Sequence, residues 1–363
     1  MKVPFFDIKI VNAPIMEEAM KKLREVASGG SFILGPEVVS FEMNFANYLG
    51  TKFACGVDSG TSALELIIRA LDIGEGDEVI TTPASFIAPS SAIAFCGAKP
   101  VFVDIDNKTY NINANKIKDK ITSKTKAILP VHLYGHVADM SKIISIAEEH
   151  GLYVIEDCCE AHGAKYNGKK AGSLGIAGAF SFYPSKNLGC WGDGGIIVSS
   201  SENLIDKVIQ LRNYGQRQKY YHETLAFNKR LDSVQAAILN LKLPILEKQN
   251  EERKWAAKLY DSLLEDSTIM TPSALNDHVY YVYVIQSEKR NELAKFLKAN
   301  DIETGVHFPI PIHLQKAFSY LKHNKGDFPE AEKLSEQCLS LPMFPEITED
   351  EIKYVAKILE FET

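Results

Sequence analysis

Short apolar runs alternate with stretches of helical periodicity through the first 200 residues of the chain. The apolar runs cover residues 54–57, 78–82, 100–104, 127–133, 153–157, 179–182 and 195–199. Stretches of roughly 10 to 15 residues with helical spacing of apolar positions separate several of them, for example residues 139–150. This alternation predicts an α/β fold built on a doubly wound, mostly parallel sheet.

The remaining sequence predicts a second, smaller unit. A long amphipathic run covers residues 231–264 with an interruption at Pro244, and beyond it a strand-like run at 279–285 alternates with helices such as 290–299. A chain of 363 residues suits one large and one small domain. We therefore expect a large domain over residues 1–245, including two N-terminal helices, and a smaller α+β domain over residues 246–363.

Charge and composition exclude several classes of protein. The net charge of −7 offers no basic surface to nucleic acid. No run approaches the roughly 20 apolar residues of a membrane span, and the first residues lack a signal-peptide core, so we expect a cytoplasmic protein. Six scattered cysteines lack the spacing of a zinc site or a disulfide framework, so we expect reduced thiols, with Cys158 and Cys159 as packing residues, and no metal.

Two polar groups follow neighbouring apolar runs in the stretch 151–195. Residues 152–155 lead into Glu156 and Asp157, where a buried parallel strand should end, the usual place for a ligand in an open α/β sheet. Residues 179–183 lead to Lys186, which stands among aromatic and apolar neighbours rather than on a polar face. Such a desolvated lysine is expected to have a lowered pKa and to be nucleophilic.

An acid and a desolvated amine at adjacent strand ends are the two groups that pyridoxal phosphate chemistry requires. The amine forms a Schiff base with the cofactor, and the acid keeps the pyridine nitrogen protonated, so that the ring acts as an electron sink. The alternative interpretation is a buried ion pair with an unrelated loop lysine.

A candidate anion site lies at residues 58–62. A strand turns there through Ser59, Gly60, Thr61 and Ser62 into a helix, which brings free backbone N–H groups to the positive end of a helix dipole. The alternative is a plain helix cap with Ser59 as the capping residue. Phe86 follows the strand expected at residues 78–82. It is either a core residue or an aromatic residue that covers the face of a planar ring.

Two further segments are candidates for binding. Residues 215–230 form a long stretch rich in tyrosine and arginine, which is either a solvated loop or one that binds phosphate or reaches a partner subunit. Between His307 and His313, two prolines keep the chain extended and hold both histidines in place.

Together these motifs resemble the DegT/StrS family of pyridoxal phosphate-dependent sugar aminotransferases over essentially all 363 residues. The matching segments are Gly60-Thr61-Ser62, Glu156-Asp157, Ala161-His162-Gly163-Ala164, the run SFYPSK that ends at Lys186, Gly192-Asp193-Gly194-Gly195, Asn228 with Arg230, and His307 to Gln315. The resemblance implies the fold type I architecture of aspartate aminotransferase and a homodimer with shared active sites.

The resemblance also implies a role for individual residues. Lys186 would be the catalytic Schiff-base lysine and the proton shuttle. The other cofactor-binding residues would be Gly60, Thr61, Phe86, Asp157, Glu160, Ser181 and, from the partner subunit, Asn228. For the substrate we expect Tyr183, Arg217, Lys219, Tyr220, Arg230, His307 and His313.

One position departs from the family in a way that bears on chemistry. Many relatives have glutamine where this chain has Glu160, close to the cofactor's phenolic oxygen. A second carboxylate would either raise the basicity of the ring or be protonated itself. A smaller departure is Ala226, since glycine is common two residues before the asparagine.

The resemblance implies transfer of an amino group from L-glutamate to a nucleotide-linked keto sugar. The form of the motifs around Lys186 and His307 is most similar to enzymes that aminate C3, so we expect a dTDP-linked 3-keto-6-deoxyhexose as acceptor. Alternatives are C4 of a 4-keto sugar and a UDP-linked 3-keto uronic acid. A family member that has lost the lysine and works as a sugar dehydratase or a regulator is disfavoured, because Lys186 is present. A non-enzymatic fold relative that senses ligands or binds DNA would need a basic face or an added DNA-binding module, which the sequence lacks.

Overall fold

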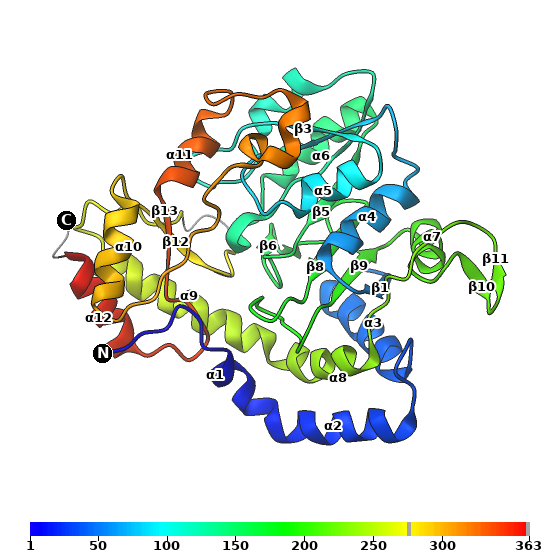
Figure 1. The fold of residues 1–363 in the computed structure, drawn as a ribbon, viewed down its shortest axis with the longest axis horizontal. Coiled ribbons are helices and arrows are strands. Elements are labelled where there is room, and N and C mark those ends of the chain that lie inside the picture. The colour runs from blue at the N-terminus through cyan, green and yellow to red at the C-terminus, as the bar shows by residue number, and fades with distance from the viewer. Residues whose placement is uncertain (274–276, 361–363) are drawn as a thin grey trace.

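A seven-stranded sheet forms the centre of the computed structural model, which describes residues 1–273 and 277–360 (Figure 1). Its strand order is β1-β9-β8-β5-β4-β2-β3. Strand β9 runs opposite to the other six strands, which all point the same way. The strands are β1 (Phe53–Val57), β2 (Glu78–Thr81), β3 (Lys99–Phe102), β4 (Thr125–Ile128), β5 (Tyr153–Asp157), β8 (Ala177–Ser181) and β9 (Gly195–Ser199). The predicted α/β fold with a mostly parallel sheet is confirmed.

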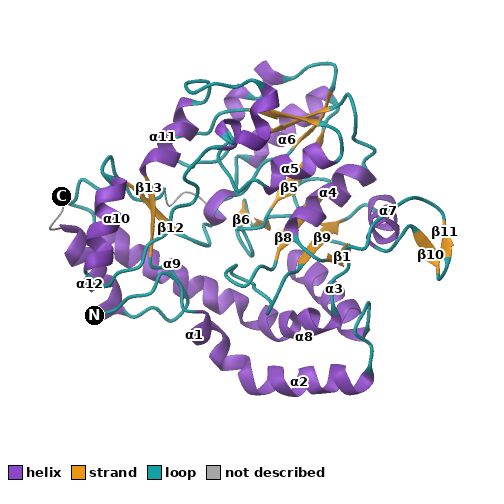
Figure 2. Ribbon diagram, viewed as in Figure 1, coloured by secondary structure: helices purple, strands orange, loops and turns teal. Residues whose placement is uncertain are grey.

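The strands read as continuous apolar runs because both faces of the sheet are covered. In β9, Ile197 belongs to one core cluster and its neighbours Ile196 and Val198 belong to the other, as the alternation of strand side chains requires. Helices α4 (Gly60–Ala70), α5 (Ala88–Phe95) and α7 (Glu202–Arg212) contribute to the first cluster. Helices α3 (Pro36–Leu49), α6 (Met140–His150) and α8 (Ser233–Lys242) contribute to the second (Figure 2).

The N-terminal helices agree with their sequence signals. Helix α1 (Ile8–Asn12) is capped by Asp7, and α2 (Met16–Gly29) ends at Gly30, which adopts the left-handed φ of 70°. Helix α3 has Pro36 in its first turn and also stops at a left-handed glycine, Gly50. Helix α2 lies on the outer side of α8 (Figure 1).

A smaller unit follows helix α9 (Leu246–Leu263) and carries its own core. Strands β12 (Tyr283–Gln286) and β13 (Cys338–Leu341) pair antiparallel, and α10 (Arg290–Ala299) and α12 (Glu349–Glu360) pack beside them. The strand expected over 279–285 is shorter. Val279 and Tyr281 donate their N–H groups to the carbonyls of Gly135 and Tyr134 instead of to a strand partner.

Two segments cross between the two units, the N-terminus and the region that ends in helix α11 (Pro329–Gln337). Val3 forms a bridge with Ile302 and lies in the core of the smaller unit. Helix α11 (Pro329–Gln337) and the segment before it return to the large sheet, where Ile312, Phe318 and Ala331 join the first core cluster. The division at residues 245 and 246 stays a prediction.

The segment 215–230 leaves the body of the molecule. It contains a short hairpin, β10 (Gln216–Gln218) with β11 (Tyr221–His222), that extends beyond α7 (Figure 1). Leu225, next to this hairpin, is 98% exposed. A second hairpin joins β6 (Lys165–Tyr166) to β7 (Lys169–Lys170). Within the described residues, no helix combines the length and hydropathy of a membrane span.

Candidate active site

A cavity of about 540 Å³ lies at the carboxyl ends of the strands. The turn from β1 into α4, the residues after β5 and β8, and segments of the smaller unit line it. Nine of the expected site residues meet here: Gly60, Thr61, Phe86, Asp157, Glu160, Ser181, Tyr183, Lys186 and His307. They converge because the ends of parallel strands share one edge of the sheet, and β1, antiparallel to β9, ends at that edge too.

Lys186 is held in the cavity by a carboxylate and an aromatic ring. Its Nζ lies 3.1 Å from Glu160 Oε1 and 4.0 Å from the centre of the Tyr281 ring. Its backbone N–H donates to the carbonyl of Tyr183 at 2.8 Å, which fixes the turn after β8. The expectation of a lowered pKa is wrong. Burial is the largest single effect and acts in that direction, but Glu160, Tyr281 and Cys159 together outweigh it and raise the pKa of Lys186 above its usual value.

Asp157 is the last residue of β5 and is almost fully buried. Its N–H donates to the carbonyl of Pro130, and its own carbonyl accepts from the N–H of His132, both at 3.0 Å. Burial raises the pKa of Asp157, although the backbone N–H of Cys159, 3.0 Å from Oδ1, acts in the opposite direction. A buried carboxylate on a fixed backbone suits a cationic ring nitrogen, because the cation would stabilise the negative charge of the carboxylate.

The start of α4 has the geometry of an anion site. It also contains the helix cap by Ser59 that was the alternative interpretation of this turn. Ser59 Oγ accepts from the N–H of Ser62 at 3.1 Å, and the first intrahelical bond begins at Ala63. Gly60 is required by close approach, because a Cβ there would lie 2.6 Å from Cys159 Sγ. Ser59, Gly60 and Thr61 line the cavity at this end of α4, which is the positive end of the helix dipole.

Phe86 stands on the wall of the cavity and is not a core residue. It is 57% exposed, and its ring centre lies 5.8 Å from that of Phe308. His307 also lines the cavity. Its Nδ1 lies 2.8 Å from Ser340 Oγ, and its carbonyl accepts from the hydroxyl of Tyr134.

Six expected residues do not line the cavity of their own chain. Arg217, Lys219 and Tyr220 are exposed on the β10–β11 hairpin, and Asn228 is exposed beyond it. Arg230 donates to Asn213 Oδ1 at 3.0 Å. The remaining one, His313, is buried with its Nε2 3.0 Å from Glu332 Oε1 and packs against Phe328.

Sequence reasoning missed two neighbours of Lys186. Tyr281 enters because its segment pairs with the turn at Tyr134, a contact between distant parts of the chain. Cys159, interpreted as a packing residue, borders the cavity, whereas Cys158 is in the core. The alternation of strand side chains was the available signal, since it places one of two consecutive residues on each face.

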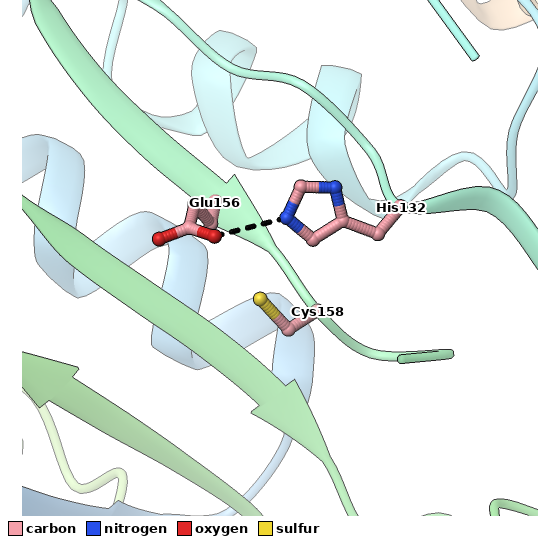
Figure 3. Close-up of side chains that lie close together, drawn as sticks. All are labelled: His132, Glu156 and Cys158. Carbon is pink, nitrogen blue, oxygen red and sulfur yellow. Dashed lines mark hydrogen bonds and ion pairs between the residues drawn. The ribbon is translucent and has the colours of Figure 1, made fainter. Parts of the chain in front are cut away.

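The two sequence neighbours of Asp157, Glu156 and Cys158, form a buried cluster with His132 (Figure 3). Glu156 Oε2 lies 3.0 Å from His132 Nε2, and the two carboxylate oxygens also accept the N–H groups of Gly172, Leu174 and Gly175. The other ring nitrogen of His132 accepts from the N–H of Ala138. The donor atoms of His132 and Glu156 are thus used in hydrogen bonds, which gives this pair a structural role.

The fold is that of the fold type I sugar aminotransferases, and the cavity brings together Lys186 and Asp157 from the ends of the adjacent strands β8 and β5. The chain belongs to the DegT/DnrJ/EryC1/StrS aminotransferase family, whose model matches residues 14–360. It is therefore an aminotransferase by family, and the predicted resemblance is confirmed.

Three curated relatives show the range of the family. The chain is similar to a "Pleiotropic regulatory protein" of Geobacillus stearothermophilus, at 46% identity over 99% of each chain. It is 44% identical, over 98% of each chain, to the dTDP-3-amino-3,6-dideoxy-alpha-D-galactopyranose transaminase of Aneurinibacillus thermoaerophilus. It is 42% identical to the UDP-N-acetyl-3-dehydro-alpha-D-glucosamine 3-aminotransferase of Acidithiobacillus ferrooxidans, over 98% of this chain and 97% of that one.

Two solved structures share the architecture. The crystal structure of DesV from Streptomyces venezuelae superposes with a TM-score of 0.97 at 40% identity, covering 99% of this chain and 98% of that one. The structure of NtdA from Bacillus subtilis, with bound cofactor PMP, gives a TM-score of 0.93 at 33% identity, covering 99% and 85%.

Proposed function

We propose that this chain transfers an amino group from L-glutamate to C3 of a dTDP-linked 3-keto-6-deoxyhexose, with pyridoxal 5′-phosphate as its cofactor. The product would be a dTDP-3-amino-3,6-dideoxyhexose. The observation that carries the proposal is the convergence of Lys186, Asp157 and the start of α4 on one cavity. The Aneurinibacillus thermoaerophilus relative, named for a dTDP-3-amino-3,6-dideoxy sugar, supports the choice of substrate class.

The residues around the cavity fit the cofactor in chemistry and in size. The N–H groups of Gly60 and Thr61, with the hydroxyl of Ser181, would hold the phosphate, and Phe86 would cover the ring. When bound, pyridoxal phosphate supplies an aldehyde for amines and a ring that accepts electrons from the carbon being deprotonated. Asp157 would keep a proton on the ring nitrogen, and Lys186 would move a proton to and from the substrate carbon.

The charges of the cavity favour a neutral sugar. Asp157, Glu160 and Asp193 line it, and Lys186 is the single lysine or arginine among the described lining residues. His307 does not add a cation near neutral pH, because burial lowers its pKa. A uronic acid would bring a carboxylate without a free counter-charge from this chain, so a 6-deoxy sugar fits better.

The residues that lie outside the cavity support a homodimer with shared sites. The β10–β11 hairpin presents Arg217, Lys219 and Tyr220 to solvent, and Asn228 is exposed beside it. We propose that these residues reach the cavity of the partner subunit. Asn228 would contact the cofactor phosphate there, and the two cations would contact the pyrophosphate of the nucleotide.

An enzyme is favoured over a regulator for this chain. One relative carries the name of a regulatory protein, but Lys186 is present here, partly buried and paired with Glu160 inside the cavity. A protein that only binds ligands has no need for a lysine held by a buried carboxylate inside its cavity.

Product analysis tests the substrate. The purified chain is incubated with glutamate and each of four acceptors, 3-keto and 4-keto 6-deoxyhexoses linked to dTDP and to UDP. NMR of the products should locate the new amine at C3 of the dTDP-linked 3-keto sugar. An amine at C4, or a strong preference for a UDP-linked acceptor, would contradict the proposal.

Trapping tests the cofactor separately. Borohydride reduction of the yellow protein should attach pyridoxal phosphate to the peptide that contains Lys186, as mass spectrometry will show. Lys165, Lys169 and Lys170 lie outside the cavity lining and serve as internal controls. Label on one of these three in place of Lys186 would exclude the assignment.

A further inference from the structure

Glu160 has a position in the site that the proposed function does not use. Its side chain is 7% exposed, and its Oε1 lies 3.1 Å from the Nζ of Lys186. Lys186 carries no comparable contact to Asp157, whose Oδ1 accepts from the backbone N–H of Cys159. The direct partner of the lysine is therefore Glu160 and not the carboxylate assigned to the ring nitrogen.

The second oxygen of Glu160 fixes the orientation of its carboxylate. Oε2 accepts the N–H of Tyr134 at 2.9 Å, and Tyr134 adopts a left-handed φ of 60°. The carbonyl of Tyr134 accepts from the N–H of Tyr281, and its hydroxyl donates to the carbonyl of His307. A turn anchored on three sides thus directs Oε1 at the lysine.

A carboxylate and an amide would behave differently at this position. A glutamine could still accept the N–H of Tyr134 through its oxygen, but its remaining atom would be an NH₂ donor facing the lysine. Two donors repel when the lysine is an ammonium, whereas a carboxylate accepts from it. Glu160 therefore matches the charged form of Lys186.

We propose that Glu160 is the proton partner of Lys186. Glu160 keeps the free lysine side chain as an ammonium, and it accepts the proton of that ammonium when the amine becomes a nucleophile. This inference rests on the proposed function only in assigning Lys186 to the cofactor. The proton moves from Nζ to Oε1, leaving a neutral amine with its lone pair and a neutral carboxylic acid. In condensation with the aldehyde of pyridoxal phosphate, the neutral amine would form a C=N bond, and its two hydrogens would leave with the aldehyde oxygen as water.

Other titratable groups also face Lys186, and their charges affect its protonation. They are Asp157, Cys159, His162, Tyr281 and His307. Burial lowers the pKa of His162 to about 3 and also lowers that of His307, so neither adds a cation at neutral pH. Burial raises the pKa of Cys159 well above its usual range, which leaves it a neutral thiol. Glu160 is then the nearest group that can exchange a proton with the amine.

Competitive labelling of cofactor-free protein measures the protonation of Lys186 without any turnover. Acetic anhydride acetylates neutral amines, and mass spectrometry quantifies the Lys186 peptide between pH 6 and 10, with the exposed Lys169 as internal reference. In Glu160→Gln, labelling of Lys186 at pH 8 should be at least about tenfold faster than in the wild-type chain, because one pKa unit changes the neutral fraction tenfold. Circular dichroism verifies the fold of each chain.

Matched variants separate the charge from the packing. Glu160→Asp keeps the charge and should stay close to wild type, and Glu160→Ala replaces the glutamine variant in the test if that chain does not fold. Glu247→Gln removes the partner of Lys170, 3.0 Å away and outside the cavity lining, and should leave Lys186 unchanged. Equal labelling profiles of Lys186 in wild type and Glu160→Gln would overturn the proposal. Because labelling needs neither sugar nor donor, failure of the sugar assay would leave this result readable.

Discussion

His132 Nε2 donates to Glu156 Oε2 across 3.0 Å, and neither side chain is exposed to solvent. The donor is the ring because its other nitrogen accepts from the N–H of Ala138, so the proton resides on Nε2. The N–H of His132 in turn donates to the carbonyl of Asp157. The pair therefore ties the end of β5, and with it the carboxylate of the site, to the neighbouring turn.

Replacing Glu156 should lower the free energy of unfolding of the protein. Glu156→Ala leaves the N–H groups of Gly172, Leu174 and Gly175 and the ring of His132 without their buried acceptor. We expect a loss of about 3–5 kcal/mol in the free energy of unfolding, measured by urea denaturation. Glu149→Ala, which breaks an exposed ion pair with Lys118, is the control and should change little. Equal stability of the two variants would contradict the structural role.

Asp157→Asn should separate catalysis from folding. The amide oxygen can still accept the N–H of Cys159, so the fold and the cavity should remain, as circular dichroism will show. A neutral side chain cannot hold the proton of a ring nitrogen, so both half-reactions should slow by roughly 100-fold or more in single-turnover spectra. Near-normal rates in this variant would remove Asp157 from the proposed role.

The sequence was sufficient for the parts of the site that depend on local patterns. Asp157 and Lys186 follow apolar runs, and such runs become neighbouring strands whose ends meet at one edge. The sheet itself was predictable for the same reason, since its strands alternate with helices along the chain.

What the sequence could not provide depends on contacts between distant segments. Tyr281 reaches Lys186 because its segment pairs with Tyr134, and no periodicity encodes that pairing. The direction of the Lys186 pKa was predicted from burial alone, whereas Glu160, 3.1 Å away, together with Tyr281 and Cys159 reverses it. His313 matched a motif, yet its ring turns toward Glu332 in a separate buried contact.

Mixing inactive subunits should restore activity if the sites are shared. Lys186→Ala lacks the amine, and Asn228→Ala lacks a side chain that is exposed in its own chain. A hybrid dimer has one site with both residues intact, so up to about half of the wild-type activity per hybrid should return. Subunit exchange is verified by mass spectrometry of isotope-labelled chains. Exchange without recovery would show that Asn228 acts within its own subunit or not at all.

Lys242 gives a pH dependence that can be isolated. It is 3% exposed, and its Nζ donates to the carbonyl of Gly189 at 2.7 Å, three residues after Lys186. Burial lowers its pKa to about 8. The unfolded chain keeps the proton up to about pH 10.4, so between pH 8 and 10 it binds more protons than the folded chain. The free energy of unfolding contributed by Lys242 must therefore rise with pH across this window.

Lys242→Met should remove that rise. Urea denaturation at pH 7, 8, 9 and 10 gives the free energy of unfolding of both chains. The difference, wild type minus variant, should increase by roughly 2 kcal/mol from pH 7 to 10, since one pKa unit corresponds to about 1.4 kcal/mol. The exposed Lys169→Met is the matched control and should follow the wild type at every pH. If wild type and Lys242→Met give parallel curves, then Lys242 does not lose its proton in the folded chain. Its ammonium would then be stabilised at the Gly189 carbonyl, and the loop after Lys186 would be held by a charged hydrogen bond over the whole range.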